Sequence, residues 1–123
     1  MPTPIAEDWW RLFRTTDGVE VSHVDLRPDD ARETEAHARL DEGERERCRR
    51  FQHPGPQRRF ALCRAAFRPI LTRRLGCGDE RLAFGAAPYT KPYALLDGRP
   101  APIAFNVSHS GDHGLIAVAP LGA

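Results

Sequence analysis

The strongest constraint on the fold is a long helical pattern in the middle of the chain. Pro56 occupies a position at which a first-turn proline is favoured, and Gly76 marks the end of the pattern. Pro69 lies inside the pattern and predicts either a kink or a free carbonyl at Ala65. Between these limits apolar residues recur at helical spacing: Phe60, Cys63, Phe67, Ile70 and Leu71. We therefore expect one main core helix against which the rest of the chain packs.

The segment before this helix predicts a strand and two short helices. Residues 19–26 alternate apolar and polar side chains between a glycine and a proline, which is typical of a half-buried strand. Asp29 or Asp30 is expected to cap a helix that runs to about residue 40. Asp41 and Glu44 have the spacing of a capping box and predict a second helix of about ten residues, ended by Pro54.

The segment after the core helix predicts short strands. Residues 82–84 are expected to form a strand, and residues 86–102 are rich in proline and glycine and are expected to form a loop. Residues 105–108 alternate apolar and polar side chains, Gly111 and Asp112 supply turn chemistry, and residues 115–119 form a short apolar run. The sequence therefore predicts an α+β domain.

Composition limits the classes of protein to consider. A chain of 123 residues with 41% hydrophobic and 28% charged residues predicts one globular domain, and a net charge of +1 gives no general attraction to nucleic acid. The apolar runs are much shorter than a membrane span, and the N-terminus does not resemble a signal peptide, so we expect a cytoplasmic protein without a membrane segment. Cys48, Cys63 and Cys77 have no metal-site or disulfide-framework spacing and are expected to be reduced packing thiols.

Three segments contain candidate binding residues. Ser108, His109 and Ser110 follow an alternating segment, and their donors suit a phosphate oxygen, although a turn histidine satisfied by its neighbours is the alternative. Arg47 and Arg50 lie three residues apart on the second predicted helix and can face one groove. The alternative there is a solvated helix whose arginines pair with its own glutamates.

The third segment is the dipeptide Lys91-Pro92. A residue before proline is held extended, so the ammonium group of Lys91 is available to a ligand. An ordinary loop lysine is the alternative.

Taken in order, these segments resemble the 4'-phosphopantetheinyl transferases of the surfactin-synthetase-activating type. The resemblance is carried by Glu-Arg-Glu-Arg-Cys-Arg-Arg-Phe at 44–51 with the arginine-rich segment that follows, by Tyr-Thr-Lys-Pro at 89–92, and by Phe-Asn-Val-Ser-His-Ser at 105–110. It implies one half of a two-half α+β fold, with an antiparallel sheet packed against helices. Residues 1–18 would then be an N-terminal extension, and residues 19–123 a domain of the N-terminal type.

The resemblance also implies a coenzyme A site. The Arg47 position in the family helps to bind the 3'-phosphate of coenzyme A, and His109 with its neighbour Ser108 matches residues that contact a coenzyme A phosphate. The loop that holds Thr90, Lys91 and Pro92 passes around the nucleotide end in the family. Thr90 replaces a family glycine there, so its side chain limits how closely the backbone approaches the adenine.

The family reaction moves 4'-phosphopantetheine from coenzyme A to a serine of an acyl or peptidyl carrier protein. It uses Mg²⁺ held by carboxylates of a Gly-x-Asp-x-Glu motif, which follows the strand that corresponds to residues 115–119. The sequence ends at Ala123, where this motif would begin, and we identify no metal ligands in it. We therefore expect the N-terminal, coenzyme A-binding half, inactive alone. A homodimer or a separate second half would complete it, and a simple truncation is the alternative. Residues 115–119 are expected to leave an uncovered surface or edge.

Two alternatives from other classes remain. One is a module that binds coenzyme A or a carrier protein without transfer. The other is a basic helical protein that binds nucleic acid through its arginine-rich helices, against which the near-zero net charge argues.

Overall fold

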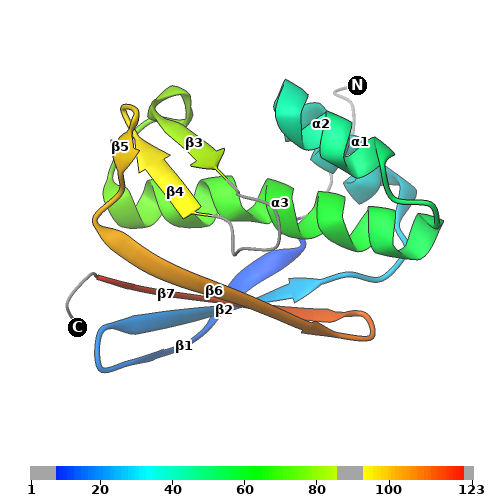
Figure 1. The fold of residues 1–123 in the computed structure, drawn as a ribbon. Helices are drawn as coiled ribbons and strands as arrows, with labels where there is room; N and C mark the ends of the chain where they lie inside the picture. Colours follow the sequence, from blue (N-terminus) through cyan, green and yellow to red (C-terminus); the bar gives the residue numbers. More distant parts are fainter. Residues whose placement is uncertain (1–7, 86–92, 121–123) are drawn as a thin grey trace, which may run out of the picture.

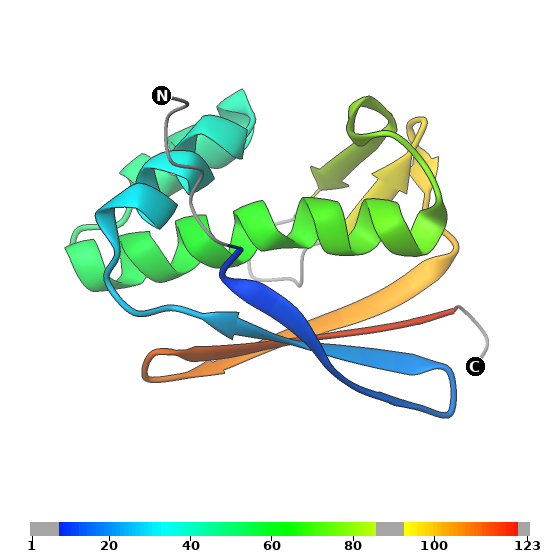
Figure 2. The same ribbon diagram turned by 180° about the vertical axis from the view of Figure 1, so that it is seen from behind.

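A long central helix separates a four-stranded sheet from two smaller groups of elements (Figure 1). The computed structural model describes residues 8–85 and 93–120. The helix is α3 (Pro54–Leu75), and it crosses one face of the sheet. Its opposite side carries two short helices near its N-terminal end and a three-stranded sheet near its C-terminal end, as the view from behind also shows (Figure 2). The α+β architecture expected from the sequence is confirmed.

The four-stranded sheet has the order β1-β2-β7-β6 and is antiparallel throughout. It is formed by β1 (Trp10–Thr16), β2 (Val19–Asp25), β6 (Ile103–Ser110) and β7 (His113–Pro120). The strands predicted around residues 19–26, 105–108 and 115–119 are thus confirmed, and β1 was not predicted. Since β7 lies between β2 and β6, the expectation that residues 115–119 form a free edge is wrong.

The two short helices begin where the sequence predicts. In α1 (Asp30–Arg39) the side chain of Asp29 accepts a hydrogen bond from the backbone N–H of Arg32. In α2 (Glu42–Arg49) Asp41 and Glu44 form the predicted capping box, with each side chain accepting from the backbone of the other. The end predicted for α2 is wrong, because the helix finishes at Arg49, before Pro54 is reached.

Helix α3 starts at Pro54, so this proline begins a helix and does not end one. A proline in the first turn loses no hydrogen bond, because the N–H groups there have no partner within the helix. The helix continues through Pro69 without interruption. The hydroxyl of Thr72 donates to the carbonyl of Arg68 at 2.8 Å. Gly76 ends it in the left-handed conformation (φ 67°), as predicted.

The loop predicted over residues 86–102 is partly wrong. The three-stranded sheet contains β3 (Leu82–Gly85), β4 (Tyr93–Leu96) and β5 (Arg99–Pro100), preceded by the short helix η1 (Asp79–Arg81). Asp97 and Gly98 form the tight turn between β4 and β5, with φ values of 52° and 81°. Both residues therefore adopt the left-handed region that a type I′ hairpin turn requires. Strand β3 confirms the strand predicted at residues 82–84.

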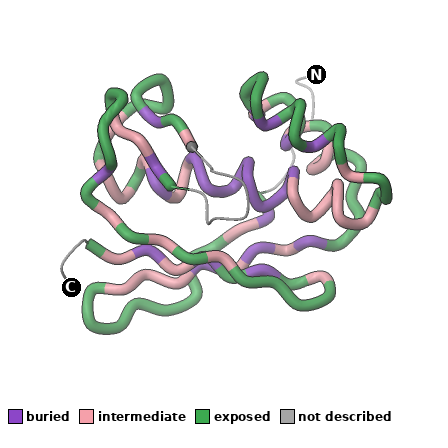
Figure 3. Tube along the Cα trace, in the orientation of Figure 1, coloured by how far each residue is buried: buried purple, intermediate pink, exposed green. Residues whose placement is uncertain are grey.

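The core lies between α3 and the face of the four-stranded sheet toward it (Figure 3). Val24, Ile116 and Val118 project from the sheet into this layer, and Leu62 and Leu71 meet them from α3 with essentially no exposed surface. The opposite face of the sheet carries exposed apolar side chains, including Phe13 and Leu115. No described element covers that face. None of the described helices is long and apolar enough to cross a membrane.

We predict that Leu62→Ala destabilises the fold by about 2–5 kcal/mol, because it removes a fully buried side chain and leaves a cavity. Leu12→Ala is the matched control, since Leu12 is 45% exposed, and it should change the free energy of unfolding by no more than about 0.5 kcal/mol. Urea unfolding followed by circular dichroism measures both. An equal decrease in the free energy of unfolding of the two variants would contradict the placement of Leu62 in the core.

Candidate functional site

His109 is the next-to-last residue of β6 and lies on the side of the sheet that faces α3. Paired residues of neighbouring antiparallel strands share a face, and Phe105 and Val107 pair with the buried Val118 and Ile116. His109 continues this row and pairs with Gly114. The imidazole is exposed at the end of the row, so it is accessible on the α3 side.

Ser108 lies on the opposite face of the sheet. It pairs with Leu115, which is 41% exposed. Successive side chains of a strand point to opposite faces, so the hydroxyl of Ser108 and the imidazole of His109 cannot line the same surface from within β6. The structure therefore separates two side chains that are adjacent in the sequence motif.

Arg58 fixes the N-terminal end of α3 to the turn between β6 and β7. Its Nε donates to the carbonyl of Leu26 at 3.0 Å, and its Nη2 lies 3.6 Å from the Asp112 carboxylate. The backbone N–H of Leu26 in turn donates to the carbonyl of Asp112 at 2.8 Å. These contacts hold the hairpin end that carries His109 beside the first half of α3.

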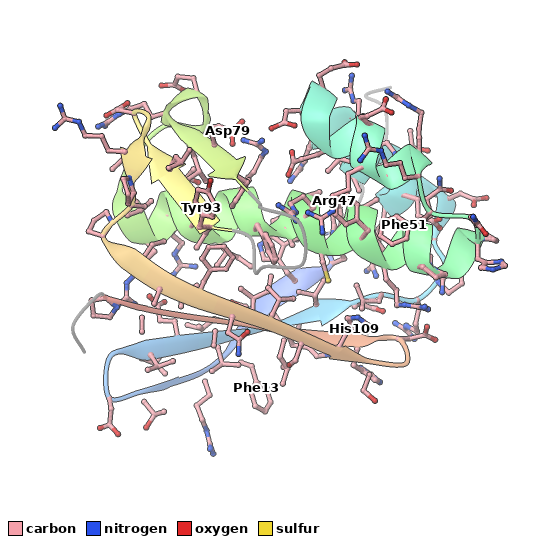
Figure 4. All side chains as sticks on the ribbon, in the orientation of Figure 1. Phe13, Arg47, Phe51, Asp79, Tyr93 and His109 are labelled. Carbon is pink, nitrogen blue, oxygen red and sulfur yellow. The ribbon has the colours of Figure 1, made fainter. Side chains whose placement is uncertain are left out.

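Arg47 reaches α3 from the other side. Its guanidinium lies 5.5 Å from the centre of the Phe60 ring, and the ring of Phe51 packs on the same phenylalanine at 5.4 Å. Figure 4 shows Arg47 and His109 in the same half of the molecule, on either side of the N-terminal part of α3. The structure thus places these two predicted residues around one segment of the core helix.

Arg47 differs from two other arginines of α2. Arg45 donates to the carbonyls of His37 and Ala38 at the end of α1, and Arg49 pairs with Glu46 at 2.7 Å. Arg47 forms no ion pair with a described residue and is exposed. The solvated, self-paired helix considered above therefore describes Arg49, whereas the charge of Arg47 remains available.

A buried ionic cluster lies beneath Arg47. Glu44 is 6% exposed, and its Oε1 accepts from Arg68 Nη2 at 2.9 Å and from the backbone N–H of Asp41 at 2.9 Å. Arg68 also donates to the carboxylate of Asp41 at 2.7 Å. Within the described part of the chain, Glu44 Oε2 has no hydrogen-bond partner, and the cation beside it is Arg64, whose Nε lies 3.8 Å away.

Thr90, Lys91 and Pro92 lie outside the described residues. Their place in the site stays a prediction from the sequence. The strands on either side of them, β3 and β4, pack over α3 through Phe84, whose ring lies 5.9 Å from that of Phe67.

The described residues contain no group of three metal-ligating side chains close enough to hold an ion. Asp112, the acidic residue near His109 in the sequence, forms an ion pair with Arg58. A cavity of about 550 Å³ lies elsewhere, between β1 and the C-terminal half of α3. Its lining includes Trp10, Ile70 and Arg73 and none of the predicted site residues.

Comparison with known proteins shows a relationship to one described protein. No family model matches the chain. A protein of Synechocystis sp. (strain ATCC 27184 / PCC 6803 / Kazusa), described as "Putative 4'-phosphopantetheinyl transferase", is 39% identical over 85 residues. The chain is thus related to the 4'-phosphopantetheinyl transferases. The match covers 69% of this chain and 34% of the Synechocystis protein, so the chain spans about a third of the length of this phosphopantetheinyl transferase relative.

Phe60 and Arg64 were not recognised as site residues from the sequence. The helical pattern assigned Phe60 to the core, and the structure shows the guanidinium groups of Arg47 and Arg64 at 5.5 and 5.1 Å from the centre of its ring. The available signal was their four-residue spacing, which puts an aromatic and a cationic side chain on one helix face. The contact with Arg47 joins two helices and had no signal in the sequence.

We predict that Glu44→Ala destabilises the protein by about 3–5 kcal/mol, because it leaves the buried charges of Arg64 and Arg68 without their shared carboxylate. Glu46→Ala is the matched control on the same helix, since Glu46 is exposed and pairs only with Arg49 among the described residues. Thermal unfolding should separate the variants clearly. A Glu44→Ala protein as stable as Glu46→Ala would contradict a structural role for the cluster.

Proposed function

We propose that this chain binds coenzyme A and supplies the coenzyme A-binding part of a 4'-phosphopantetheinyl transferase. The observation that carries the proposal is the placement of Arg47 and His109, two residues of the family motifs, around the same segment of α3. The complete reaction would transfer 4'-phosphopantetheine from coenzyme A to a serine of an acyl or peptidyl carrier protein. We propose the cytoplasm as the site of this reaction.

The two residues would hold the phosphates of coenzyme A. A guanidinium group binds a phosphate through two parallel N–H donors, and Arg47 is exposed, with no carboxylate of the described residues competing for it. His109 is exposed on the α3 side of β6 and can donate a hydrogen bond to a phosphate oxygen in its neutral or its charged form. Their role is therefore binding and positioning.

Ser108 is proposed to contribute differently from His109. Its hydroxyl lies on the far face of the sheet, so in this arrangement only its backbone belongs to the same surface as the imidazole. Thr90, Lys91 and Pro92 complete the proposed coenzyme A site on the basis of the sequence motif alone.

Mg²⁺ would neutralise charge on the diphosphate in such a transfer. The described residues do not fit this ion, because no three of their carboxylate, imidazole or thiol groups converge. We therefore assign the chain a binding role and propose that carboxylates for the metal come from a second copy or from another polypeptide segment.

We predict that Arg47→Met and His109→Ala each weaken coenzyme A binding by about 10-fold or more, since each removes a hydrogen bond to a charged group. Isothermal titration of the purified chain with coenzyme A measures the affinities. Arg49→Met is the matched control, because Arg49 lies on the same helix and pairs with Glu46. Unchanged affinity in both site variants would overturn the site assignment.

Transfer is tested separately from binding. The chain is incubated with coenzyme A, Mg²⁺ and an apo carrier protein, and the intact mass of the carrier is measured. We expect no gain of phosphopantetheine by this chain alone, while a complete phosphopantetheinyl transferase in a parallel reaction modifies the same carrier. A gain with this chain alone would contradict the binding-only role and point to a metal site completed within one chain or a homodimer.

The second candidate function is a module that holds coenzyme A or a carrier protein without transfer. The absence of a convergent metal-ligand group among the described residues favours it. It is distinguished by adding polypeptides that carry the family's carboxylate motif: restored transfer supports the transferase, and binding without transfer supports the module.

A further inference from the structure

Arg64 is an arginine in the core whose guanidinium group lies near only one carboxylate of the described residues. Its side chain is 8% exposed, although it carries a charge. Its nearest carboxylate oxygen, Glu44 Oε2, lies 3.8 Å away, which exceeds hydrogen-bond distance, and Arg64 forms no hydrogen bond with a described residue. Buried charges are normally paired and hydrogen-bonded, so this arrangement calls for an explanation.

Three aromatic rings hold the Arg64 guanidinium in place. The centres of Phe60, Phe67 and Phe84 lie 5.1, 5.3 and 5.4 Å from its Cζ atom. These rings stabilise a cation through their faces but accept none of its N–H donors. The group is therefore positioned and charged, while none of the described residues accepts a hydrogen bond from it.

Arg64 and Arg47 share one of these rings. Both guanidinium groups lie within 5.5 Å of the centre of Phe60, one reaching it from α3 and the other from α2. Burial lowers the pKa of Arg64, the Glu44 carboxylate acts in the opposite direction, and the positive charge of Arg47 lowers this pKa further. An anion near both groups would relieve this repulsion and satisfy the N–H donors of both side chains.

Arg68, the neighbouring buried arginine, also lies over the Phe84 ring, at 5.4 Å from its centre, but differs from Arg64 because its terminal nitrogens donate hydrogen bonds. Its guanidinium donates to Glu44, Asp41 and the carbonyl of Leu82. The terminal nitrogens of Arg68 are thus committed to the structure of the cluster, and only its buried Nε has no partner among the described residues, whereas Arg64 and Arg47 form no hydrogen bond with a described residue.

We propose that Arg64 is a second phosphate-binding arginine, which acts with Arg47 beside the Phe60 ring to bind a phosphate monoester, namely the 3'-phosphate of coenzyme A. This inference rests on the proposed function and adds a specificity-determining residue to it. It implies that the chain distinguishes coenzyme A from dephospho-coenzyme A, which lacks that phosphate. The distinction would be made by a residue buried in the core and not by surface charge alone.

The test compares the affinities of coenzyme A and dephospho-coenzyme A by isothermal titration for the wild-type chain, Arg64→Met and the control Arg49→Met. We expect Arg64→Met to lose about 10- to 100-fold of the affinity for coenzyme A, as for a lost charge-assisted hydrogen bond. Its affinity for dephospho-coenzyme A should change by less than about threefold, and Arg49→Met should behave as wild type. A merely structural role of Arg64 would lower both affinities together.

Arg64→Lys keeps the test decisive if the methionine variant fails to fold. Lysine retains the positive charge but not the planar fork of donors, so this variant should show an intermediate loss for coenzyme A alone. Equal changes in the two affinities of the folded variant would overturn the inference. A wild-type chain that binds coenzyme A and dephospho-coenzyme A equally well would also overturn the inference, but it would leave the proposed coenzyme A binding intact. A wild-type chain that binds neither ligand would overturn the proposed function as well.

Discussion

The arrangement of the helices depends on the hydrogen bonds that the Glu44 carboxylate accepts. One of its oxygens closes the capping box at the start of α2 and accepts a hydrogen bond from Arg68 on α3. The same group therefore decides where α2 begins and how it sits on the core helix. A carboxylate with 7% of its side chain exposed is costly to bury unless its partners are in place, so the two helices form this junction together or not at all. The position of Arg47 follows from that junction.

The other side of the candidate site depends on the sheet. The row formed by Phe105 and Val107 packs toward α3, and His109 ends this row beyond the apolar core. Arg58 connects the hairpin turn to the helix, so the histidine and the helix do not move independently. One surface of the site is thus set by an ionic junction between helices and the other by apolar packing of a strand. The two surfaces of the site are thus positioned by different interactions in different parts of the chain, which explains why the site residues are distant in sequence.

Local signals predicted much of the fold. The capping box at Asp41, the helical spacing that ends at Gly76 and the alternation of β2 all act within a few residues, and the structure confirms them. The strands that were missed, β1, β4 and β5, flank two Asp-Gly turns with positive φ, Asp17-Gly18 and Asp97-Gly98. That dipeptide is a strong hairpin signal, but the proline content of residues 86–102 favoured a loop. The contacts of Phe60, Arg64 and Glu44 join residues of different helices, and no local spacing in the sequence encodes such contacts.

The turn between β6 and β7 has a consequence for chemistry. Gly111 adopts a φ of 58° there and closes a tight connection that fixes the register of the two strands. Because side chains alternate between faces, a shift of β6 by one residue would bring the hydroxyl of Ser108 to the α3 side and turn the imidazole of His109 away. A single backbone conformation thus selects which functional group the protein presents. In evolutionary terms, an insertion or deletion at this turn would exchange a titratable group for a neutral one without altering either residue.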